Sequence, residues 1–269
     1  MRQLIANADD FGWSDHTVEA TKQCFAAGVL SSATLMVNRP GFPQAAAYAR
    51  QHPEFSYGLH ICLVDERPIS PVASIPSLVG SNGLLHRTPQ FFLRAALGLI
   101  RWQDICREVR AQTACMQVTG LQPSHFDSHG HMHRVPVVIR ALLYLADETG
   151  VKAVRGAQDI FVQPRLTMIR SLYNRRVTNA LRRQYMTPDH FFMVTGCSRL
   201  AASNWWRHAL ESLPEGTTEI GYHPGFQEEE WRTLETRAVM LGGRECIDAA
   251  GIRVINYKEF SVASCPDGA

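Results

Sequence analysis

The sequence lacks the features that mark secreted, membrane-spanning and nucleic-acid-binding proteins. Its 7 cysteines are odd in number and widely spread and include no Cys-x-x-Cys pair, so we expect reduced, mostly buried thiols and a cytoplasmic location. No uncharged apolar run reaches the roughly 18 residues that a membrane span requires, because Arg94 interrupts the nearest candidate, 91–100. The apolar run after Met1 is too short for a signal peptide. A formal net charge of +2 does not indicate nucleic-acid binding.

Common nucleophile and phosphate-binding motifs are absent as well. The chain contains no Gly-x-Ser-x-Gly and no Gly-x-x-x-x-Gly-Lys. Cys62 lies two residues from His60, but strand alternation would place both along one face of a buried strand, and nothing else indicates a thiolate. Neither an internal repeat nor a low-complexity linker divides the chain. We therefore expect one domain over residues 1–269.

The composition is that of a globular protein with a sizeable core, because 45% of the residues are hydrophobic and 19% are charged. Short apolar runs alternate with segments of helical spacing, which predicts parallel βα units. The predicted fold is a single-domain α/β protein, a TIM-like β/α barrel that is distorted or seven-stranded. We expect strands at 4–8, 32–37, 57–63, from 123 onward, and at 151–154, 191–194, 218–222 and 252–257. We expect helices from 14 or 15 to 28 and at 41–51, 103–119, 136–150, 204–213, 228–241 and 245–250.

Two segments depart from this alternation. Residues 64–102 form an irregular insertion, rich in Pro, Ser and Gly up to residue 90 and apolar from Phe91 to Trp102. Residues 160–190 hold a second insertion with a basic amphipathic helix at about 160–186, which contains arginines but no acidic residue. The simplest interpretation is a helix with a core-facing and a solvated side. The alternative is a face that meets anionic lipid or a phosphate-bearing substrate.

The densest chemistry lies in a His-rich tract in which His125, Asp127, His129, His131 and His133 occupy every second position. If the tract is extended, alternate residues project to one side, and all five groups point the same way. Imidazole and carboxylate are the usual ligands of zinc and related divalent ions. The tract therefore predicts a metal site in which one or two of these side chains reach the ion and others orient the ligands. A solvated turn or a histidine hydrogen-bond cluster are the alternatives.

Other unusual polar residues also follow predicted strands: Asp9, Asp10, His60, Arg155 and His223. In a parallel β/α barrel the carboxyl ends of the strands lie on one face, where active sites are built. Each residue has a structural interpretation of its own: the aspartates as helix caps or turn residues, His60 as a core histidine and His223 as a turn residue. Their common topological position favours one shared site.

The adjacent carboxylates allow a division of labour. If one of Asp9 and Asp10 binds a metal ion, the other can take the proton of a water whose pKa the ion lowers, and the hydroxide so formed attacks a carbonyl. His223 suits the role of the acid that protonates the leaving group, because its ordinary pKa lies near working pH. Arg155 can anchor the base or bind an anionic part of the substrate. These residues indicate metal-assisted hydrolysis of an amide or ester.

With these residues in view, the chain resembles the YdjC-like carbohydrate deacetylases, the group that includes ChbG and HpnK. The resemblance runs from near the start to about residue 225. It is carried by Asn7-Ala8-Asp9-Asp10-Phe11-Gly12, Gly58-Leu59-His60, His125-Phe126-Asp127-Ser128-His129 and Tyr222-His223-Pro224-Gly225. The segments 63–68 and 75–78 are closer to the HpnK branch, which is associated with hopanoid lipid biosynthesis.

The resemblance implies a barrel-like β/α fold, one divalent ion (Mg²⁺ or Zn²⁺) and hydrolysis of the N-acetyl group of an amino sugar. It implies Asp10, His60 and His129 as metal ligands and Asp9 as general base, with His223 as the acid. Gly130 stands where some relatives carry another histidine, so which of the remaining histidines assists stays open. The expected residues that support the ligands or contact the substrate are His125, Asp127, His131, His133, Arg155 and Tyr222.

The expected substrate is an N-acetylated oligosaccharide or a glycolipid. A glycolipid would suit the apolar segment 91–102 and the Arg-rich helix, and it would bring peripheral contact with the inner membrane face. A metal-dependent phosphoesterase that uses the arginines to bind phosphate, and a sugar- or metal-binding module without catalysis, are the competing hypotheses. The sequence fixes neither the sugar nor the oligomeric state, for which a homodimer is one option.

Overall fold

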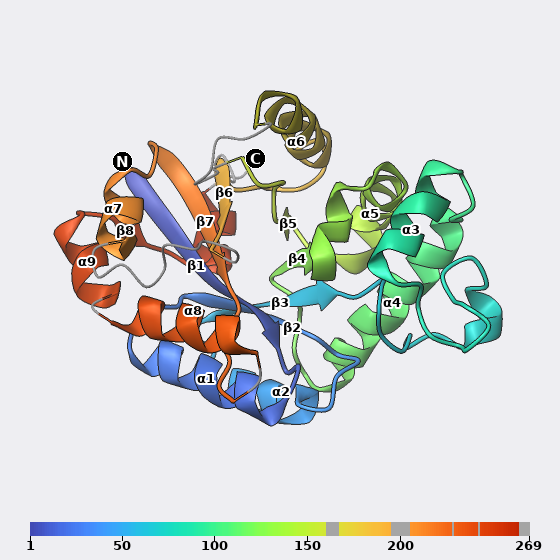
Figure 1. Cartoon of the computed structure of the whole chain (residues 1–269), viewed down its shortest axis with the longest axis horizontal. Helices are drawn as coiled ribbons and strands as arrows, with labels where there is room; N and C mark the ends of the chain where they lie inside the picture. The colour runs from blue at the N-terminus through green and yellow to red at the C-terminus, as the bar shows by residue number, and fades with distance from the viewer. Residues whose placement is uncertain (160–166, 195–204, 228, 242, 264–269) are drawn as a thin grey trace.

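The strands form one parallel sheet whose order along the sheet is β5-β4-β3-β2-β1-β7-β6 (Figure 1). A computed structural model describes residues 1–159, 167–194, 205–227, 229–241 and 243–263. The strands are β1 (Arg2–Phe11), β2 (Ser32–Leu35), β3 (Ser56–Ile61), β4 (His125–Ser128), β5 (Ala153–Val154), β6 (His190–Met193) and β7 (Gly216–Tyr222). The short β8 (Arg253–Val254) pairs with the beginning of β1. The expected α/β class with a distorted, seven-stranded barrel-like sheet is confirmed.

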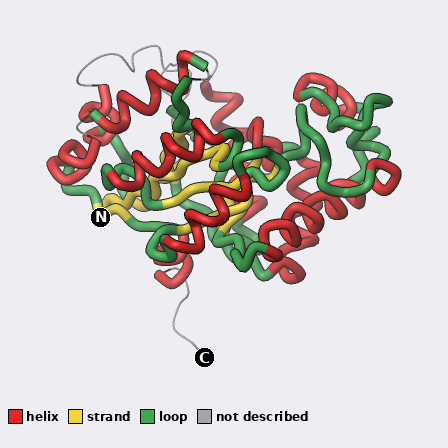
Figure 2. The backbone as a smooth tube through the Cα atoms, turned by 90° about the horizontal axis from the view of Figure 1, so that it is seen from below, coloured by secondary structure: helices red, strands yellow, loops and turns green. Residues whose placement is uncertain are grey.

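Helices surround the sheet, as the tube view shows (Figure 2). Along the chain they are α1 (Asp15–Ala26), α2 (Phe42–Gln51), α3 (Thr88–Ala96), α4 (Trp102–Val118), α5 (Pro136–Thr149), α6 (Thr167–Leu181), α7 (Trp205–Glu211), α8 (Glu230–Met240), α9 (Gly243–Ala249) and α10 (Tyr257–Ala263). Two 3-10 segments, η1 (Val72–Ser74) and η2 (His129–Arg134), lie in the connections. In Figure 1, α1, α2 and α8 lie along one side of the molecule, and α3, α4 and α5 form a lobe at the other.

Local sequence signals explain several helix boundaries. Ser14 caps α1, since its side chain accepts from the Thr17 N–H while the Thr17 hydroxyl oxygen accepts from the Ser14 N–H. Pro136 opens α5, where its missing N–H has no helical partner to lose. Gly150 ends α5 in the left-handed conformation, at φ 68°, which glycine adopts without steric cost.

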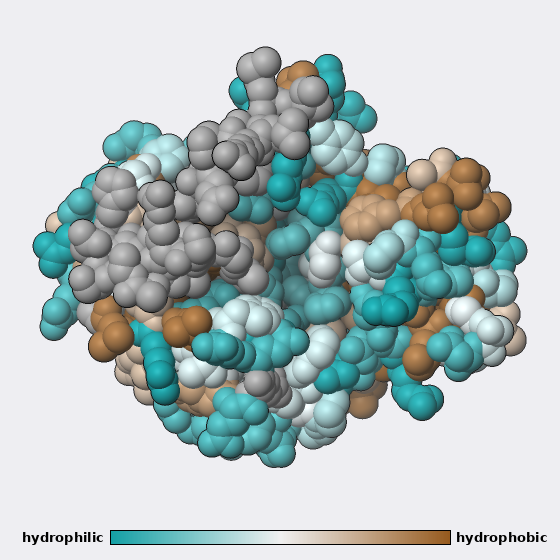
Figure 3. Space-filling model, in the orientation of Figure 1, coloured by the Kyte–Doolittle hydropathy of each residue, from teal (hydrophilic) through white to brown (hydrophobic). Residues whose placement is uncertain are grey.

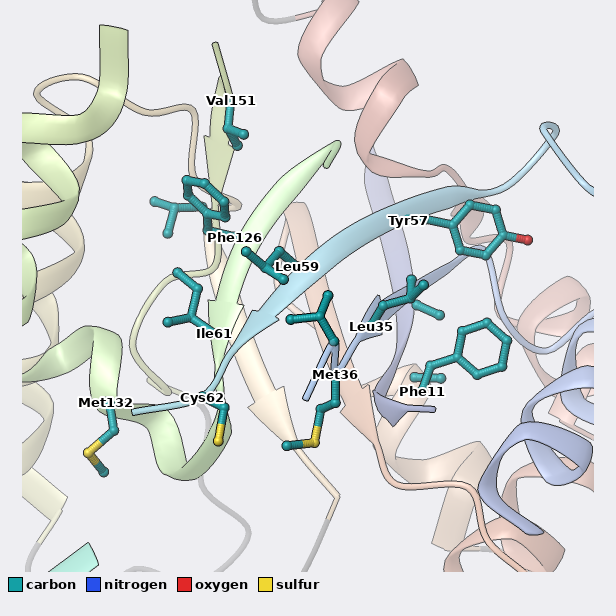
Figure 4. Packing of buried hydrophobic residues seen from close by; sticks show 14 of the residues in the cluster. Phe11, Leu35, Met36, Tyr57, Leu59, Ile61, Cys62, Phe126, Met132 and Val151 are labelled. Carbon is teal, nitrogen blue, oxygen red and sulfur yellow. The ribbon is translucent and has the colours of Figure 1, made fainter. Parts of the chain in front are cut away.

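Strand alternation separates an apolar layer from a polar interior. Leu35, Leu59 and Phe126 belong to the main hydrophobic cluster, and Figure 4 shows Leu59 and Phe126 side by side on neighbouring strands. Their neighbours along the strands, such as Thr34 and His60, are buried as well but point to the opposite face. The inner face of the curved sheet therefore carries polar side chains, and these make the candidate site.

A small apolar cluster closes the interior near the amino-terminal half of β1. It is composed of Ile5, Ala153, Ile255, Tyr257 and Phe260, with Met186 packed against it. Two of its members come from α10, which begins where the sequence predicted the last residue of a strand. That prediction of a strand over 252–257 is wrong beyond β8, because Tyr257 starts a helix whose rings fill the floor of the interior.

The expected extension of the whole His-rich tract is also wrong. Extended backbone ends at Ser128, and the chain then turns through η2, where Gly130 (φ 61°) and His131 (φ 56°) are left-handed. Within the irregular segment 64–102, the apolar part forms α3 and the approach to α4. The basic helix is α6, which lies in the chain between β5 and β6; residues 160–166 of the predicted insertion lie outside the described residues. Over the part of the chain that the structure describes, no helix is long and apolar enough to cross a membrane.

The small apolar cluster that includes Tyr257 and Phe260 should contribute to stability. Phe260→Ala removes a buried ring, and we expect the free energy of unfolding to fall by about 3 kcal/mol, measured by urea denaturation followed by circular dichroism. Val262 lies on the same helix and is 77% exposed, so Val262→Ala serves as the matched control. Its effect should stay within about 0.5 kcal/mol. Equal losses in the two variants would contradict the role of α10 as the floor.

Candidate active site

Three side chains converge at the carboxyl ends of β1, β3 and β4. One Asp10 oxygen, Oδ1, lies 3.2 Å from His60 Nε2 and 3.1 Å from His129 Nδ1. These three atoms all lie within 4.8 Å of one another, which is the arrangement of a group that can hold a metal ion. Asp10 and His60 are buried, whereas His129 keeps about a fifth of its side chain exposed. The site is therefore open to solvent on the His129 side.

Backbone strain explains how two adjacent carboxylates reach the same site. Successive residues of a regular strand point to opposite faces of the sheet, so Asp9 and Asp10 should diverge. Asp10 instead has a φ of 57°, in the left-handed region that non-glycine residues seldom adopt. The pairing of β1 with β2 also shifts register between Ala8 and Phe11. This local distortion turns Asp10 toward the interior that Asp9 already faces.

His60 is oriented by the residue opposite it in the sheet. Its Nδ1 lies 2.7 Å from Asp127 Oδ1, and the Thr34 hydroxyl donates to Asp127 Oδ2 at 2.9 Å. A carboxylate on one ring nitrogen fixes the histidine tautomer and leaves the other nitrogen to face a metal. Burial lowers the pKa of His60, but the Asp127 and Asp10 carboxylates outweigh it and raise that pKa to about 10. The position thus favours positive charge.

Asp9 is held by a buried arginine. Arg155 donates from Nη1 and Nη2 to the two Asp9 oxygens, both at 2.6 Å, and Asn7 donates to Asp9 Oδ1 at 2.9 Å. Burial raises the pKa of Asp9, but the charge and hydrogen bonds of Arg155 overcome that effect and lower the pKa below its ordinary value. Asp9 is therefore ionised at neutral pH and fixed in orientation, beside His60.

Arg155 serves two further carboxylates. Its Nη1 lies 2.8 Å from Asp127 Oδ2, and its Nε donates to Glu219 Oε1 at 2.8 Å. The Tyr257 hydroxyl of the floor donates to Glu219 Oε2 at 2.6 Å. Burial raises the pKa of Glu219 to about 7, because one guanidinium shared among three carboxylates compensates Glu219 only in part.

The other histidines of the tract lie apart from the convergent group. His125 stacks on Tyr257 with ring centroids 3.6 Å apart, and its Nδ1 meets the Ser124 hydroxyl at 2.9 Å. His133 uses both nitrogens, on Ser128 Oγ at 2.7 Å and on the Gly156 carbonyl at 3.3 Å.

His131 lies edge-on to His133 and to Phe191. Among the described residues none of His125, His131 and His133 joins a group that can hold a metal ion. Burial lowers the pKa of all three, that of His133 to about 3, so they stay neutral.

The two residues expected to contribute from the end of β7, Tyr222 and His223, lie in different surroundings. His223 keeps 16% of its side chain exposed; its backbone N–H donates to Glu235 Oε1 at 2.8 Å and its Nδ1 lies 3.7 Å from the same oxygen. Burial lowers the pKa of His223, but Glu235, Asp10 and Asp9 raise it above its ordinary value, which places the ring within electrostatic reach of the site. Tyr222 is instead buried in the main hydrophobic cluster.

Sequence reasoning missed four residues of this network: Asn7, Thr34, Glu219 and Arg232. Arg232 of α8 donates from Nη2 to Asp10 Oδ2 at 2.6 Å, and its guanidinium lies over the Trp13 and Trp231 rings at 5.5 and 4.7 Å. Within the described residues its buried Nη1 has no hydrogen-bond partner. Arg232 lies on a helix, so a search for polar residues at the ends of predicted strands does not find it.

The donor set fits a divalent cation. One carboxylate and two imidazoles are a common ligand combination for zinc and for other first-row metals. A second possible group, Asp9, His60 and Asp127, suits an ion less well, because Arg155 already occupies both Asp9 oxygens. We therefore take Asp10, His60 and His129 as the candidate metal ligands.

The raised pKa of Glu219 predicts a pH dependence of stability. The folded state binds this proton more tightly than the unfolded state, so stability falls as pH rises from about 5 to about 8, by about 1.4 kcal/mol for each unit of pKa difference. Glu219→Gln does not titrate there. We expect the unfolding free energy of the unaltered protein, relative to Glu219→Gln, to fall over this range in urea denaturation. Parallel curves would show that Glu219 has an ordinary pKa.

Comparisons with known proteins bear on the family and the fold. The chain is 40% identical to a carbohydrate deacetylase of Geobacillus stearothermophilus over 58% of this chain and 62% of that protein. It is 36% identical to a chitooligosaccharide deacetylase of Serratia marcescens over 55% and 57%, so the matches span less than two thirds of these relatives.

A crystal structure of an Enterococcus faecalis V583 protein has the same fold, with a TM-score of 0.79 and 23% identity over 96% of this chain and 98% of that one. The model of the YdjC-like protein family matches residues 3–250, so the resemblance drawn from the sequence is confirmed: the chain belongs to the YdjC-like protein family.

Proposed function

We propose that this protein is a metal-dependent hydrolase that removes the N-acetyl group from an N-acetylated amino sugar. The observation that carries the proposal is the convergence of Asp10, His60 and His129, with a second, ionised carboxylate, Asp9, beside them. The family relatives named carbohydrate deacetylase and chitooligosaccharide deacetylase support the choice of substrate. The substrate is an oligosaccharide or a glycolipid.

Asp10 Oδ1, His60 Nε2 and His129 Nδ1 would hold the ion, for which Mg²⁺ and Zn²⁺ are the candidates. When bound, a divalent ion supplies a Lewis acid that polarises the acetyl carbonyl and lowers the pKa of a water. The residues around the ligands keep the donors in place: Asp127 orients His60, and Arg232 holds the second oxygen of Asp10. Arg232 thereby leaves only Oδ1 of Asp10 to face the ion.

Asp9 acts as the general base that takes a proton from the attacking water. Arg155 and Asn7 keep it ionised and oriented for this step. His223 acts as the acid that protonates the departing amine, because Glu235 and the two aspartates favour its protonated form. His223 keeps part of its side chain exposed, so a bound substrate can reach it.

The direct test is to incubate metal-loaded protein with short N-acetylglucosamine oligomers and with N-acetylated glycolipids and to measure free acetate. The proposal expects acetate from at least one of these substrates and none after the metal is removed with a chelator. Phosphate release from phosphate esters, without acetate release from acetylated sugars, would overturn it in favour of a phosphoesterase. Tight sugar binding without any turnover would overturn it in favour of a binding module.

Asp9→Asn separates the base from the metal site. Asparagine preserves the shape of the side chain but cannot take a proton, so we expect turnover to fall by roughly 10²- to 10⁴-fold. Elemental analysis of the purified variant should still find metal. Circular dichroism checks that the variant is folded, because Arg155 loses a charged partner. Acetate release equal to that of the unaltered protein would rule out Asp9 as the base.

His129→Ala removes a proposed ligand. We expect the purified variant to lose most of its bound metal and its acetate release, because two protein ligands remain where three converge. His16, an exposed histidine of α1, provides the matched control, and His16→Ala should keep both. Metal content measured by elemental analysis decides the outcome, and a full complement of metal in His129→Ala would contradict the ligand assignment.

A further inference from the structure

A cavity lies outside the candidate site, between α3, the start of α5 and α6. Its volume is about 410 Å³, which is in the range of small-molecule pockets. Most of its lining is apolar or aromatic, including Phe92, Ala95, Val135, Val137 and Tyr173. We call it the α3–α6 hollow. Nothing in the proposed deacetylation chemistry uses it.

The charged lining of the hollow has one sign. Arg134 and Arg170 contribute to it, and none of the described residues that line it is acidic. Arg134 is half-buried, with its guanidinium 6.0 Å from the Phe92 ring centroid. Burial and the neighbouring Arg170 lower the pKa of Arg134, so the positive charge of the half-buried Arg134 is disfavoured at this position. An anion between Arg134 and Arg170 would stabilise that charge.

The helices that line the hollow, and the chain that follows α3, expose further apolar side chains. On the α3 side, Leu93, Leu97 and Leu99 are 62%, 63% and 48% exposed. Leu172 of α6 is 52% exposed. Figure 3 shows hydrophobic residues gathered over α3, while the middle of the same face is hydrophilic. Apolar side chains gathered on the surface in this way mark a ligand or interaction site.

The hollow and the candidate metal site share one wall. Segment η2 begins with His129, whose ring faces Asp10, and ends with Arg134, which lines the hollow. His129 and Arg134 are five residues apart, so their Cα atoms lie no more than about 18 Å apart even if the chain between them were fully extended. A short glycan spans such a distance. A substrate held in the hollow can therefore present its sugar to the metal ligands.

We propose that the α3–α6 hollow binds the apolar chain of an amphiphilic substrate whose acidic linking group pairs with Arg134 and Arg170. The substrate class is then a lipid-linked amino sugar with a phosphate between chain and sugar. A half-open pocket of this size fits a single chain, whereas adsorption to a flat bilayer needs no cavity. The assignment rests on the proposed function for the sugar end, but the binding of the chain end is independent of it.

The binding arm uses dodecyl phosphate below its micelle concentration, with inorganic phosphate and the neutral amphiphile dodecyl maltoside as comparisons, followed by calorimetry. We expect dodecyl phosphate to bind at least about tenfold more tightly than either, because burial of methylenes and charge-assisted hydrogen bonds both contribute. Equal affinity for dodecyl phosphate and inorganic phosphate would show that the hollow does not bind the apolar chain. Equal affinity for dodecyl phosphate and dodecyl maltoside would show that Arg134 and Arg170 do not pair with the acidic group.

Two variants locate the binding. Ala95→Trp fills the hollow, and the double variant Arg134→Gln/Arg170→Gln removes its charge. Both should weaken dodecyl phosphate binding by about tenfold or more. Ala26→Trp on α1 controls for the added ring and Arg237→Gln on α8 for the loss of a surface charge, both at exposed positions. Unchanged binding in both hollow variants, or equal weakening in the controls, would overturn the location.

The kinetic arm separates this inference from the proposed function. Acetate release is compared for N-acetylglucosamine 1-phosphate esterified with a dodecyl or with a methyl group. We expect kcat/KM to favour the dodecyl ester by about tenfold and Ala95→Trp to abolish that preference while leaving the methyl ester unaffected. Equal kcat/KM for the two esters overturns the inference and leaves the deacetylase intact. Dodecyl phosphate binding in the hollow without acetate release from any substrate overturns the deacetylase instead.

Discussion

The interior of the barrel depends on one buried guanidinium. Arg155 is fully buried and bonds to carboxylates from three strands: Asp9 of β1, Asp127 of β4 and Glu219 of β7. Without it, three carboxylates would be buried close together with no compensating charge, which costs several kcal/mol for each ion. Arg155 therefore allows the inner face to be polar, and it joins β1, β4 and β7 across the interior in addition to the backbone ladders.

The carboxylates of the site still carry more negative charge than the neighbouring arginines neutralise. Four carboxylates (those of Asp9, Asp10, Asp127 and Glu219) face two arginines, Arg155 and Arg232. The remaining negative charge raises the pKa of His60, which lies between Asp10 and Asp127. A divalent cation at the convergent Asp10, His60 and His129 atoms would neutralise the same charge. The charge balance and the ligand geometry thus point to one position, on the solvent side of Arg155.

The sequence predicted those site residues that come directly after a strand in the chain. Because carboxyl ends of parallel strands meet on one face, Asp10, His60 and the His-rich tract were predicted to lie together. The resemblance to the YdjC-like family implied Asp10, His60 and His129 as ligands, and the structure brings these three together. The same rule cannot reach Arg232, which comes from a helix, or Glu219, which lies inside β7. Tyr257 was misread because an apolar run of strand length also suits a short buried helix. The alternation of histidines misled in the same way, since a two-residue period describes a side-chain direction only while the backbone stays extended.

The break in that tract explains why two different surfaces meet at η2. If the strand continued past Ser128, residues 129, 131 and 133 would all face the polar interior. The left-handed residues Gly130 and His131 end the strand, and η2 then separates the tract's roles. His129 stays at the metal group, His133 turns into bonds with Ser128 and Gly156, and Arg134 reaches the α3–α6 hollow. Glycine at 130 suits the turn because a Cβ there would carry the strain of a positive φ and press to 3.3 Å from Met132 Cε. Gly130 is thus the position that lets a single segment reach both the candidate metal ligands and the apolar cavity.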